Sequence, residues 1–290
     1  MPTMVHLRPM TVHDVEAVAA VVDAADRAAE RRPGDDYRPP SDEQRGVMDR
    51  GTRRFIERDP AGAWVADRDG EVVGIAEAIR RGPFWGLSML FVHPSAQSQG
   101  VGRRLLETAL AYADGAELRM IMTSSDPRAL RRYSLAGLDI HPAVNADGVV
   151  HRSAIPAGLP GRAGDEDDLD LVERVDVSLR GSRREDVEFM LATGARLDVI
   201  DSPDGSGYVV SRSDRVAMLG ATDERTATAL LWRALAQAEG KAHISCLTAQ
   251  QDWAVRVALT ARLSVAPTGP LFVSGMERPP GPWIANGWYF

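Results

Sequence analysis

The spacing of apolar residues in the first half of the chain predicts a mixture of helices and strands. Apolar side chains recur every three to four residues from Val12 to Ala29, which is the period of a half-buried helix. Ser41 suits the N-cap of a second helix that runs to about Arg58. The turn Arg68-Asp69-Gly70 predicts a hairpin between two short apolar runs. The expected strands are Val5–Arg8, Ala63–Asp67, Glu71–Arg80, Gly86–Val92 and Leu118–Thr123, and a short helix is expected over Arg128–Ala136.

The second half of the chain repeats the order of elements predicted for the first. Asp147-Gly148 predicts one more hairpin, and residues 156–170 combine Pro, Gly and an acidic cluster, which is typical of a linker. Beyond the linker, strands are expected over Gly207–Arg212, Val216–Gly220 and Ala242–Leu247, and helices over Thr226–Ala238 and Trp253–Leu263. The length of 290 residues is comfortable for two cores. We therefore predict two mixed α/β domains, 1–155 and 171–290, joined by that linker.

The turn after strand Gly86–Val92 predicts a phosphate-binding loop. It contains the pattern Gln97-x-x-Gly100-x-Gly102 and leads into an amphipathic helix. Two glycines allow a tight turn and a close approach of the backbone to a ligand. The start of the helix then offers unpaired N–H groups and the positive end of the helix dipole. Strand, glycine loop and helix together predict a cradle for pyrophosphate oxygens.

The residues after the second glycine exclude two common phosphate loops. A Walker loop needs Gly-Lys-Ser/Thr, where this chain has Arg103 and Arg104, and a dinucleotide fingerprint needs a glycine at Leu105. The loop instead closely resembles the acetyl-CoA loop of the GNAT superfamily of N-acetyltransferases, Gln/Arg-x-x-Gly-x-Gly/Ala after a strand that ends in Val-x-Pro. Val92 and Pro94 supply that strand end. The resemblance implies an α/β (α+β) fold of two tandem GNAT-like domains, each a mixed, mostly antiparallel sheet flanked by helices.

The resemblance also implies acetyl-CoA as the acyl donor and co-substrate. Backbone amides of the loop would hold its pyrophosphate, and the splayed end of the central strand would pair with its pantetheine arm. The residues expected to bind it are Phe91, Val92, His93, Gln97, Ser98, Gln99, Gly100, Val101, Gly102 and Arg103. In the second repeat the matching turn Ala221–Ala227 has no glycine, and Asp223 and Glu224 would repel a pyrophosphate. The second domain is therefore expected to be a degenerate copy that has lost cofactor binding.

A second motif predicts the proton donor. The segment from Arg128 to Leu138 resembles the family pattern Ala-x-x-Leu/Phe-Tyr-x-x-x-Gly-Phe/Leu, with Tyr133 at the tyrosine position. In the family this tyrosine usually lies near the CoA sulfur and protonates it. A phenol with an ordinary pKa near 10 is protonated at neutral pH and suits a thiolate leaving group. The sequence departs from the family in two places: Arg132 replaces an apolar residue, and Ser124-Ser125-Asp126-Pro127 stands where the family often has an Asn that contacts the cofactor. Ser124 or Ser125 could substitute for that Asn, whereas a negative Asp126 would not favour CoA.

Three groups and water are candidates for the general base. Glu77 lies on the third strand, where several family members carry a base that works through water, but alternation alone does not say which face it occupies. His93 has a suitable pKa but lies inside the Val-x-Pro turn. The C-terminal carboxylate of Phe290 ends an aromatic tail that would also serve to seal an interface. We take Glu77, together with Tyr133, as the catalytic residues to test.

The acceptor is expected to be a primary amine that attacks the thioester directly in a ternary complex. The first helices and the turn at 80–86 would form its site, and acidic and aromatic side chains there suit a cationic amine. The candidates are Tyr37, Phe84 and Trp85, with Asp35 and Asp36 beside them. A small molecule and a protein amine both stay open as substrates. The alternative function is a non-catalytic acyl-CoA-binding sensor or scaffold, and the intact Tyr133 favours the enzyme.

The composition of the chain limits which binding partners and which cellular compartment we expect. A net charge of −7 and the lack of a basic stretch argue against a nucleic-acid binder. No apolar run approaches the roughly 20 residues of a membrane helix, and the N-terminus lacks the apolar core of a signal peptide. Cys246 is the only cysteine, and no pattern of metal-binding Cys and His is present. We predict a cytoplasmic enzyme without a metal, acting as a monomer or homodimer.

Overall fold

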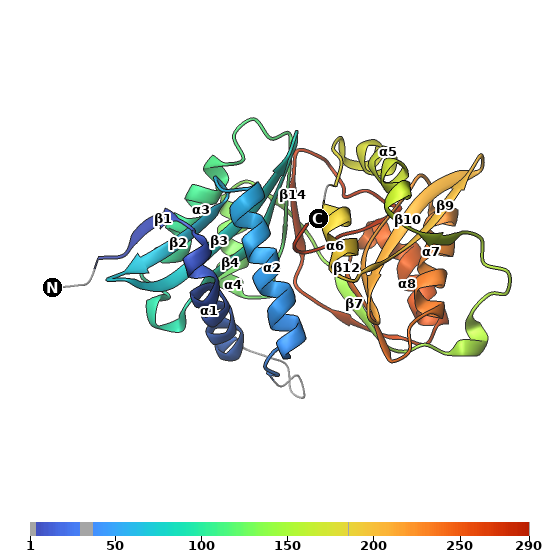
Figure 1. Cartoon of the computed structure of the whole chain (residues 1–290), viewed down its shortest axis with the longest axis horizontal. Helices are drawn as coiled ribbons and strands as arrows, with labels where there is room; N and C mark the ends of the chain where they lie inside the picture. Colours follow the sequence, from blue (N-terminus) through green and yellow to red (C-terminus); the bar gives the residue numbers. More distant parts are fainter. Residues whose placement is uncertain (1–3, 30–36, 185, 290) are drawn as a thin grey trace. The chain divides into compact units, whose positions relative to one another are not determined.

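The computed structural model describes residues 4–29, 37–184 and 186–289. These residues form two mixed sheets, of seven and eight strands, flanked by helices (Figure 1). The chain divides into two compact units. Unit 1 comprises Met1–Arg80 and Trp85–Ala116, and unit 2 comprises Arg81–Phe84 and Glu117–Phe290. The predicted fold class, two mixed sheets with flanking helices, is confirmed.

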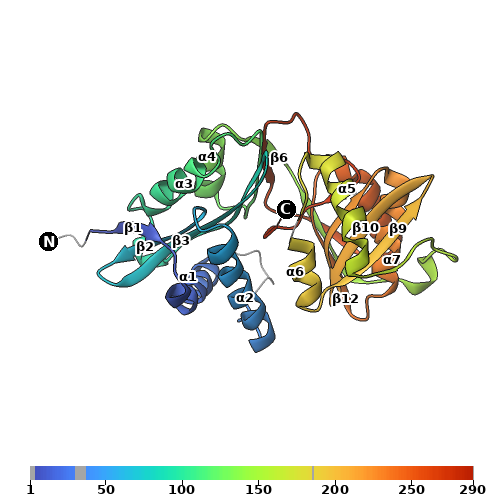
Figure 2. The same cartoon turned by 45° about the horizontal axis from the view of Figure 1, so that its top comes forward.

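Unit 1 is built on four strands in the order β1-β2-β3-β4. β2 pairs antiparallel with both β1 and β3. Helices α1 and α2 lie on one face of these strands, and α3 lies on the other (Figure 2). The elements are β1 His6–Pro9, the 3₁₀ turn η1 Val12–Asp14, α1 Val15–Ala28, α2 Asp42–Arg58, β2 Ala63–Arg68, β3 Glu71–Arg81, β4 Phe84–Val92, η2 Pro94–Ala96 and α3 Val101–Ala111.

Local sequence signals account for several of these elements. The Ser41 hydroxyl accepts a hydrogen bond from the Gln44 N–H (3.2 Å), and the Gln44 side chain accepts one from the Ser41 N–H (2.8 Å). This reciprocal capping box starts α2 where the sequence predicts. The β2–β3 hairpin turns at Asp69 and Gly70, both with left-handed backbone (φ 53° and 86°). The predicted second helix and the predicted hairpin are confirmed.

Unit 2 contains a reciprocal exchange of strands. Strand β14 (Leu271–Ser274) comes late in the chain but lies between β5 (Leu118–Met122) and β6 (Asp139–His141), antiparallel to both. Strand β7 (Val144–Val149) comes early but lies between β12 (Lys241–Leu247) and β13, antiparallel to both. The first repeat therefore places β7, and the second repeat places β14, among the strands of the other repeat.

The exchange shows that the predicted hairpin at Asp147-Gly148 is wrong. β7 runs through both residues without a turn. Asp147 pairs with His243 on one side and with Ser264 of β13 (Ser264–Pro267) on the other. Pairing along both edges of the strand outweighs the local turn preference of the Asp-Gly dipeptide. The same pairing joins residues 117–155 to the second half of the chain within unit 2.

The eight-stranded sheet follows the order β13-β7-β12-β11-β10-β9-β8, and β15 pairs with β11. Its two faces carry different helices. Val209 of β10 belongs to an apolar core with side chains of α7 and α8, whereas the neighbouring Tyr208 donates a hydrogen bond to Asp176 of α5 (2.6 Å). The further elements are β8 Arg162–Gly164, η4 Glu166–Asp168, α5 Leu169–Arg180, α6 Asp186–Ala192, β9 Arg196–Ser202, β10 Gly205–Arg212, β11 Arg215–Ala221, α7 Glu224–Ala236, α8 Asp252–Thr260 and β15 Trp283–Ile284.

A side-chain contact repeats in both halves of the chain. Arg8 on β1 makes a two-pronged ion pair with Asp14 (2.9 and 2.8 Å), the residue before α1. Arg162 on β8 makes the same pair with Asp168 (2.8 and 2.6 Å), the residue before α5. Both pairs span six residues. Ordered structure of the second repeat therefore begins inside the stretch 156–170 that was predicted to be a linker.

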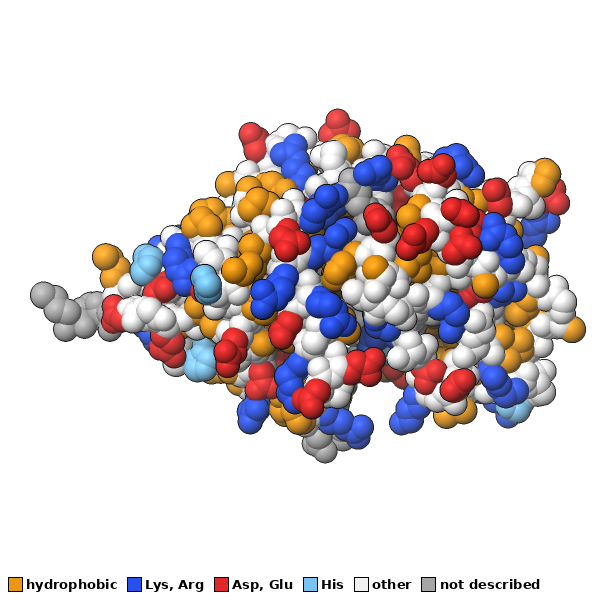
Figure 3. All heavy atoms as spheres, in the orientation of Figure 1, with side chains coloured by type: hydrophobic (Ala, Val, Ile, Leu, Met, Phe, Trp, Pro, Cys, Tyr) orange, Lys and Arg blue, Asp and Glu red, His pale blue; other side chains and the backbone are white. Residues whose placement is uncertain are grey.

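The described surface carries charges of both signs. On the face shown in Figure 3, Lys and Arg side chains are intermixed with Asp and Glu side chains. No helix among the described residues is long and apolar enough to cross a membrane. Within the same residues, no group of three or more His, Cys, Asp or Glu side chains could hold a metal ion. None of these observations identifies a partner, so the expected partners stay predictions.

Candidate functional site

The loop between β4 and α3 is tied to the end of the strand. The Gln97 side-chain amide donates a hydrogen bond to the Val92 carbonyl (3.1 Å). Ser98 and Gly100 then adopt left-handed backbone conformations (φ 61° and 80°), and α3 begins at Val101. Glycine adopts this conformation without steric cost. The glycine at position 100 therefore sets the sharp entry into the helix.

The start of α3 has the geometry of an anion site. The N–H groups of Gly100, Val101 and Gly102 donate to no acceptor within the described residues. The N–H groups of Arg103 and Arg104 close the first turn on the Gly100 carbonyl (both 3.1 Å). A Cβ at Gly100 would meet no atom within 4 Å, so the backbone borders open space. Free N–H donors at the positive end of a helix fit pyrophosphate oxygens.

The side chains around the loop mostly stabilise the loop itself. Gln99 donates its amide to the Ser95 carbonyl (2.9 Å). The His93 Nδ1 accepts the Ser95 N–H (3.2 Å), which caps η2 and engages this nitrogen in the turn. Arg103 is exposed and lies 3.8 Å from Glu107, one helical turn further on. The predicted cofactor-binding stretch Phe91–Arg103 thus forms one continuous strand end, loop and helix start in unit 1.

Glu77 is a buried carboxyl group in the middle of β3. It lies opposite Ala63 of β2, and its side chain is fully buried. Neither carboxyl oxygen has a geometrically satisfied hydrogen bond within the described part of the chain. Burial raises its pKa to about 8, and the nearby Thr52 hydroxyl of α2 opposes this rise. Strand alternation alone did not decide which face of β3 carries the Glu77 side chain. The contact with Thr52 shows that it is the face toward α2.

Tyr133 is a buried phenol on α4 (Pro127–Leu135) in unit 2. Its ring packs edge-on against Phe272 of β14, with 5.6 Å between ring centroids and 69° between planes. Burial raises its pKa to about 12, while the Arg132 charge and the Thr123 hydroxyl act in the opposite direction. The phenol therefore holds its proton throughout the physiological pH range.

Asp126 has a structural role at the start of α4. Its carboxylate accepts the Arg128 N–H (2.8 Å) and forms an ion pair with the Arg128 guanidinium (2.7 Å). Both contacts hold the pKa of Asp126 below its ordinary value. This departure from the family pattern thus supplies a helix cap whose charge is already paired.

Two of the predicted acceptor-binding residues are buried in separate units. Phe84 belongs to unit 2 and is fully buried, with the Arg180 guanidinium 4.4 Å above its ring centroid. Trp85 belongs to unit 1 and is also fully buried. Neither ring is open to solvent, so contact with an acceptor would require both side chains to be uncovered.

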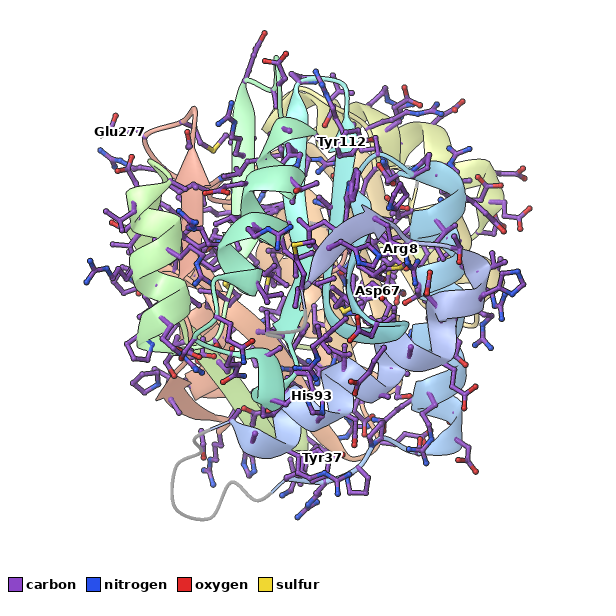
Figure 4. All side chains as sticks on the ribbon, turned by 90° about the vertical axis from the view of Figure 1, so that its left-hand side faces the viewer. Arg8, Tyr37, Asp67, His93, Tyr112 and Glu277 are labelled. Carbon is purple, nitrogen blue, oxygen red and sulfur yellow. The ribbon has the colours of Figure 1, made fainter. Side chains whose placement is uncertain are left out.

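Tyr37 is the third predicted acceptor-binding residue, and it lies beside α1 (Figure 4). Its hydroxyl donates a hydrogen bond to Asp23, and the Arg27 guanidinium lies 5.1 Å from its ring centroid. The bond to Asp23 raises the pKa of Tyr37. The candidates Asp35 and Asp36, and the candidate base at the Phe290 carboxylate, lie outside the described residues.

The second repeat has a different arrangement at the start of its matching helix, α7. The Asp223 carboxylate accepts the Thr226 N–H (2.9 Å) and also the Thr226 hydroxyl (2.7 Å). An aspartate therefore caps α7 where the first repeat leaves free N–H donors. Its negative charge would oppose a second anion at that position.

Three residues near the candidate catalytic groups were missing from the sequence predictions. Thr52 adjoins Glu77, and Thr123 and Phe272 adjoin Tyr133. Thr52 and Phe272 are distant in sequence from the groups that they adjoin, whereas Thr123 lies ten residues before Tyr133. No local pattern of spacing marks these three residues. For Phe272 the sequence offers only a short run of apolar residues.

Comparisons with known proteins agree with this geometry. Residues 26–137 match the model of the acetyltransferase (GNAT) family. The chain is similar in structure to a Pyrococcus horikoshii protein described as an acetyltransferase, with 15% identity, coverage of 98% of this chain and 95% of the other, and a TM-score of 0.77. A GCN5-related N-acetyltransferase from Kribbella flavida matches with 16% identity, coverage of 93% and 71%, and a TM-score of 0.60. A tandem GNAT protein from the clavulanic acid biosynthesis pathway matches with 15% identity, coverage of 93% and 98%, and a TM-score of 0.57.

Proposed function

The chain carries a GNAT acetyltransferase domain within a fold of two tandem GNAT-like repeats, and from this we propose that it is an acetyl-CoA-dependent N-acetyltransferase. The first repeat is the catalytic one, and the second is a degenerate copy. The acceptor is a primary amine of a small molecule or a protein. Acetyl-CoA would supply an activated acetyl group whose thioester carbon the amine attacks directly.

The observation that carries this proposal is the start of α3. Three backbone N–H groups, from Gly100 to Gly102, donate to no acceptor within the described residues at the positive end of a helix, and Gly100 borders open space. They would hold the pyrophosphate of the donor, and Arg103 would add a positive charge from its exposed position. At the start of α7 the Asp223 carboxylate instead accepts the Thr226 N–H, so a negative charge already lies at that helix start. This contrast supports donor binding by the first repeat.

Tyr133 would hold the proton that the departing thiolate needs. Its pKa of about 12 keeps the phenol protonated at neutral pH. A phenol is also a weaker acid than a thiol, whose ordinary pKa is near 8.5, so transfer becomes favourable only if the surroundings stabilise the phenolate. Arg132 and Thr123 are placed to do so, because both lower the pKa of this phenol.

Glu77 would accept the proton of the acceptor ammonium, through water because its carboxylate is buried. A base works best when its pKa lies near the working pH. The pKa of about 8 meets this condition. Because the ionised carboxylate is the active form, kcat/KM should rise with pH up to about 8 and then level off.

Calorimetric titration with CoA tests donor binding directly. The wild type should release heat on binding, and Gly100→Glu should abolish it, since the new carboxylate would meet the pyrophosphate. Gly158→Glu is the matched control, because Gly158 also has left-handed backbone (φ 67°) and open space around its Cβ position. Equal binding by wild type and Gly100→Glu would refute the site.

Release of free CoA across a panel of primary amines tests the reaction and identifies the acceptor class. Tyr133→Phe should keep the CoA affinity and lower kcat by about 100-fold, within the usual range for general acid catalysis. CoA binding without acetyl transfer to any amine would instead support an acyl-CoA sensor.

A further inference from the structure

Strand β14 belongs to the second repeat by its place in the chain. It follows α8 and β13, which correspond to α4 and β6 of the first repeat. In space it pairs with β5 through the register Phe272↔Ile121 and with β6 through the register Phe272↔Ile140. The second repeat therefore contributes backbone and side chains to the part of the fold that carries α4.

Phe272 is the side chain through which β14 reaches Tyr133. Its ring is fully buried and meets the tyrosine ring edge-on, with centroids 5.6 Å apart. Edge-to-face packing of this kind favours one orientation of a ring over others. The neighbouring Val273 is also fully buried and points to the opposite face of the strand. The contact with Tyr133 is thus specific to one position of β14.

Thr123 is fixed by the segment that leads into β14. Its N–H donates to the Pro270 carbonyl (3.3 Å). Next to this bond, a Cβ at Gly269 would lie only 1.8 Å from the Thr123 carbonyl oxygen, so the two backbones approach as closely as glycine allows. The Thr123 hydroxyl in turn interacts with the Tyr133 phenol. The second repeat thus contacts the Tyr133 ring through Phe272 and the backbone of Thr123 through Gly269 and Pro270.

We infer that the second repeat, although degenerate, supplies the strand that positions the proton donor of the first. Phe272 and Thr123 are positioning residues: Phe272 orients the Tyr133 ring and excludes water from it, and Thr123 holds the phenol oxygen. This inference rests on the proposed role of Tyr133 in acetyl transfer. It assigns the second repeat a function that needs no second acetyl-CoA site.

A substrate-free titration tests the contacts. A 3,5-difluorotyrosine at position 133 ionises at a lower pH than tyrosine, so its fluorine NMR signal can be followed while the protein stays folded. Phe272→Leu should lower the pKa of this phenol by about one unit, since it relieves desolvation. Thr123→Val should raise that pKa, because it removes a group that stabilises the phenolate, and Thr123→Ser should restore it. Val273→Ala, the control on the same strand, should leave it unchanged.

Opposite shifts from the two substitutions separate positioning from general damage to the fold. A loss of packing would move the phenol pKa in one direction in every variant, including Val273→Ala. Shifts in the same direction, or no shift in Phe272→Leu and Thr123→Val, would overturn the inference. This readout needs no acceptor, so it can fail independently of the proposed acetyl transfer.

A double-mutant cycle links the contacts to catalysis. With acetyl-CoA and the amine that releases CoA fastest, Phe272→Leu should lower kcat about 10-fold and leave the KM for acetyl-CoA within twofold. In a Tyr133→Phe background the same substitution should have no further effect on kcat, because the group that it positions is gone. If the double variant instead lost kcat by the product of the two single losses, the inference would be overturned. Unchanged turnover in Tyr133→Phe alone would instead remove Tyr133 from the proposed mechanism.

Discussion

Burial of the Glu77 side chain disfavours ionisation of its carboxyl group. The carboxyl group is fully buried, and its pKa is raised from 4.5 to about 8. Below pH 4.5 the group is protonated in the folded and the unfolded chain alike. As the pH rises from 4.5 to about 8, the unfolded chain releases the proton while the folded chain keeps it, so stability falls by about 1.4 kcal/mol per pH unit. The total loss above pH 8 is about 5 kcal/mol.

Glu77→Gln should remove this pH dependence. We expect the free energy of unfolding of the variant, minus that of wild type, to be several kcal/mol larger at pH 9 than at pH 5, so the variant gains stability relative to wild type as the pH rises. Urea unfolding curves at the two pH values measure the difference. Glu71→Gln is the control, because Glu71 lies on the same strand but is exposed. An equal effect of Glu77→Gln at both pH values would show that the buried carboxyl is not protonated at neutral pH.

Residues differ in how far their environment can be predicted from sequence. Gly100 was predictable because its left-handed backbone is a property that glycine itself favours. The burial of Glu77 was not, because strand alternation allows two faces and only contact with Thr52 of α2 decides between them. The position of Tyr133 was suggested by a motif, but its packing against Phe272 depends on a strand 138 to 141 residues further along the chain.

At the scale of elements, two glycines hold β14 against β5. A Cβ at Gly269 would lie 1.8 Å from the Thr123 carbonyl oxygen, and a Cβ at Gly275 would lie 1.6 Å from the Glu117 carbonyl oxygen. Gly275 also has left-handed backbone (φ 93°). Any side chain at these ends would force the backbone of β14 away from its partner. The two glycines therefore fix where the exchanged strand begins and ends.

Gly275→Ala should cost roughly 3 kcal/mol of stability, because it combines backbone strain with an overlap that only a strand shift can relieve. Gly137→Ala should cost only about 1–2 kcal/mol, since Gly137 has left-handed backbone (φ 83°) but no atom within 4 Å of the added carbon. Chemical denaturation of both variants measures the difference. Similar losses of stability in the two variants would mean that β14 can move away from β5 without cost.

Strand partners were the part of the fold that the sequence left undetermined. The capping box of α2 and the turn of the β2–β3 hairpin act within a few residues, so their signals can be read locally. The short apolar run at β14 suits a strand in either sheet, because pairing is decided by contacts distant in sequence. β7 has no continuous apolar run at all, since its apolar residues are separated by polar residues and glycine. Asp147-Gly148 even carried a turn signal, which pairing on both edges of β7 overrode.

At the scale of the whole molecule, the exchange makes each repeat depend on the other. β14 contributes Leu271, Phe272 and Val273, none of them more than 1% exposed. Burial of three such side chains stabilises a fold by roughly 5–9 kcal/mol. A typical domain has a total stability of only about 5–15 kcal/mol. A first repeat without β14 would therefore lose much of the stability that keeps it folded, and it would also expose the facing edges of β5 and β6.

Expression of the two halves as separate chains tests this dependence. The fragment 1–155 should fail to melt cooperatively on its own, because it lacks β14 and carries β7 without its partners β12 and β13. Co-expressed with 156–290, it should co-purify as a one-to-one complex, since each fragment then receives the strand it lacks. With the fragment 1–143, which omits β7, the fragment 156–290 would still lack that strand, so this pair should co-purify less well. Circular dichroism melts and affinity co-purification measure both outcomes, and cooperative, native-like melting of 1–155 alone would show that the exchanged strand is dispensable.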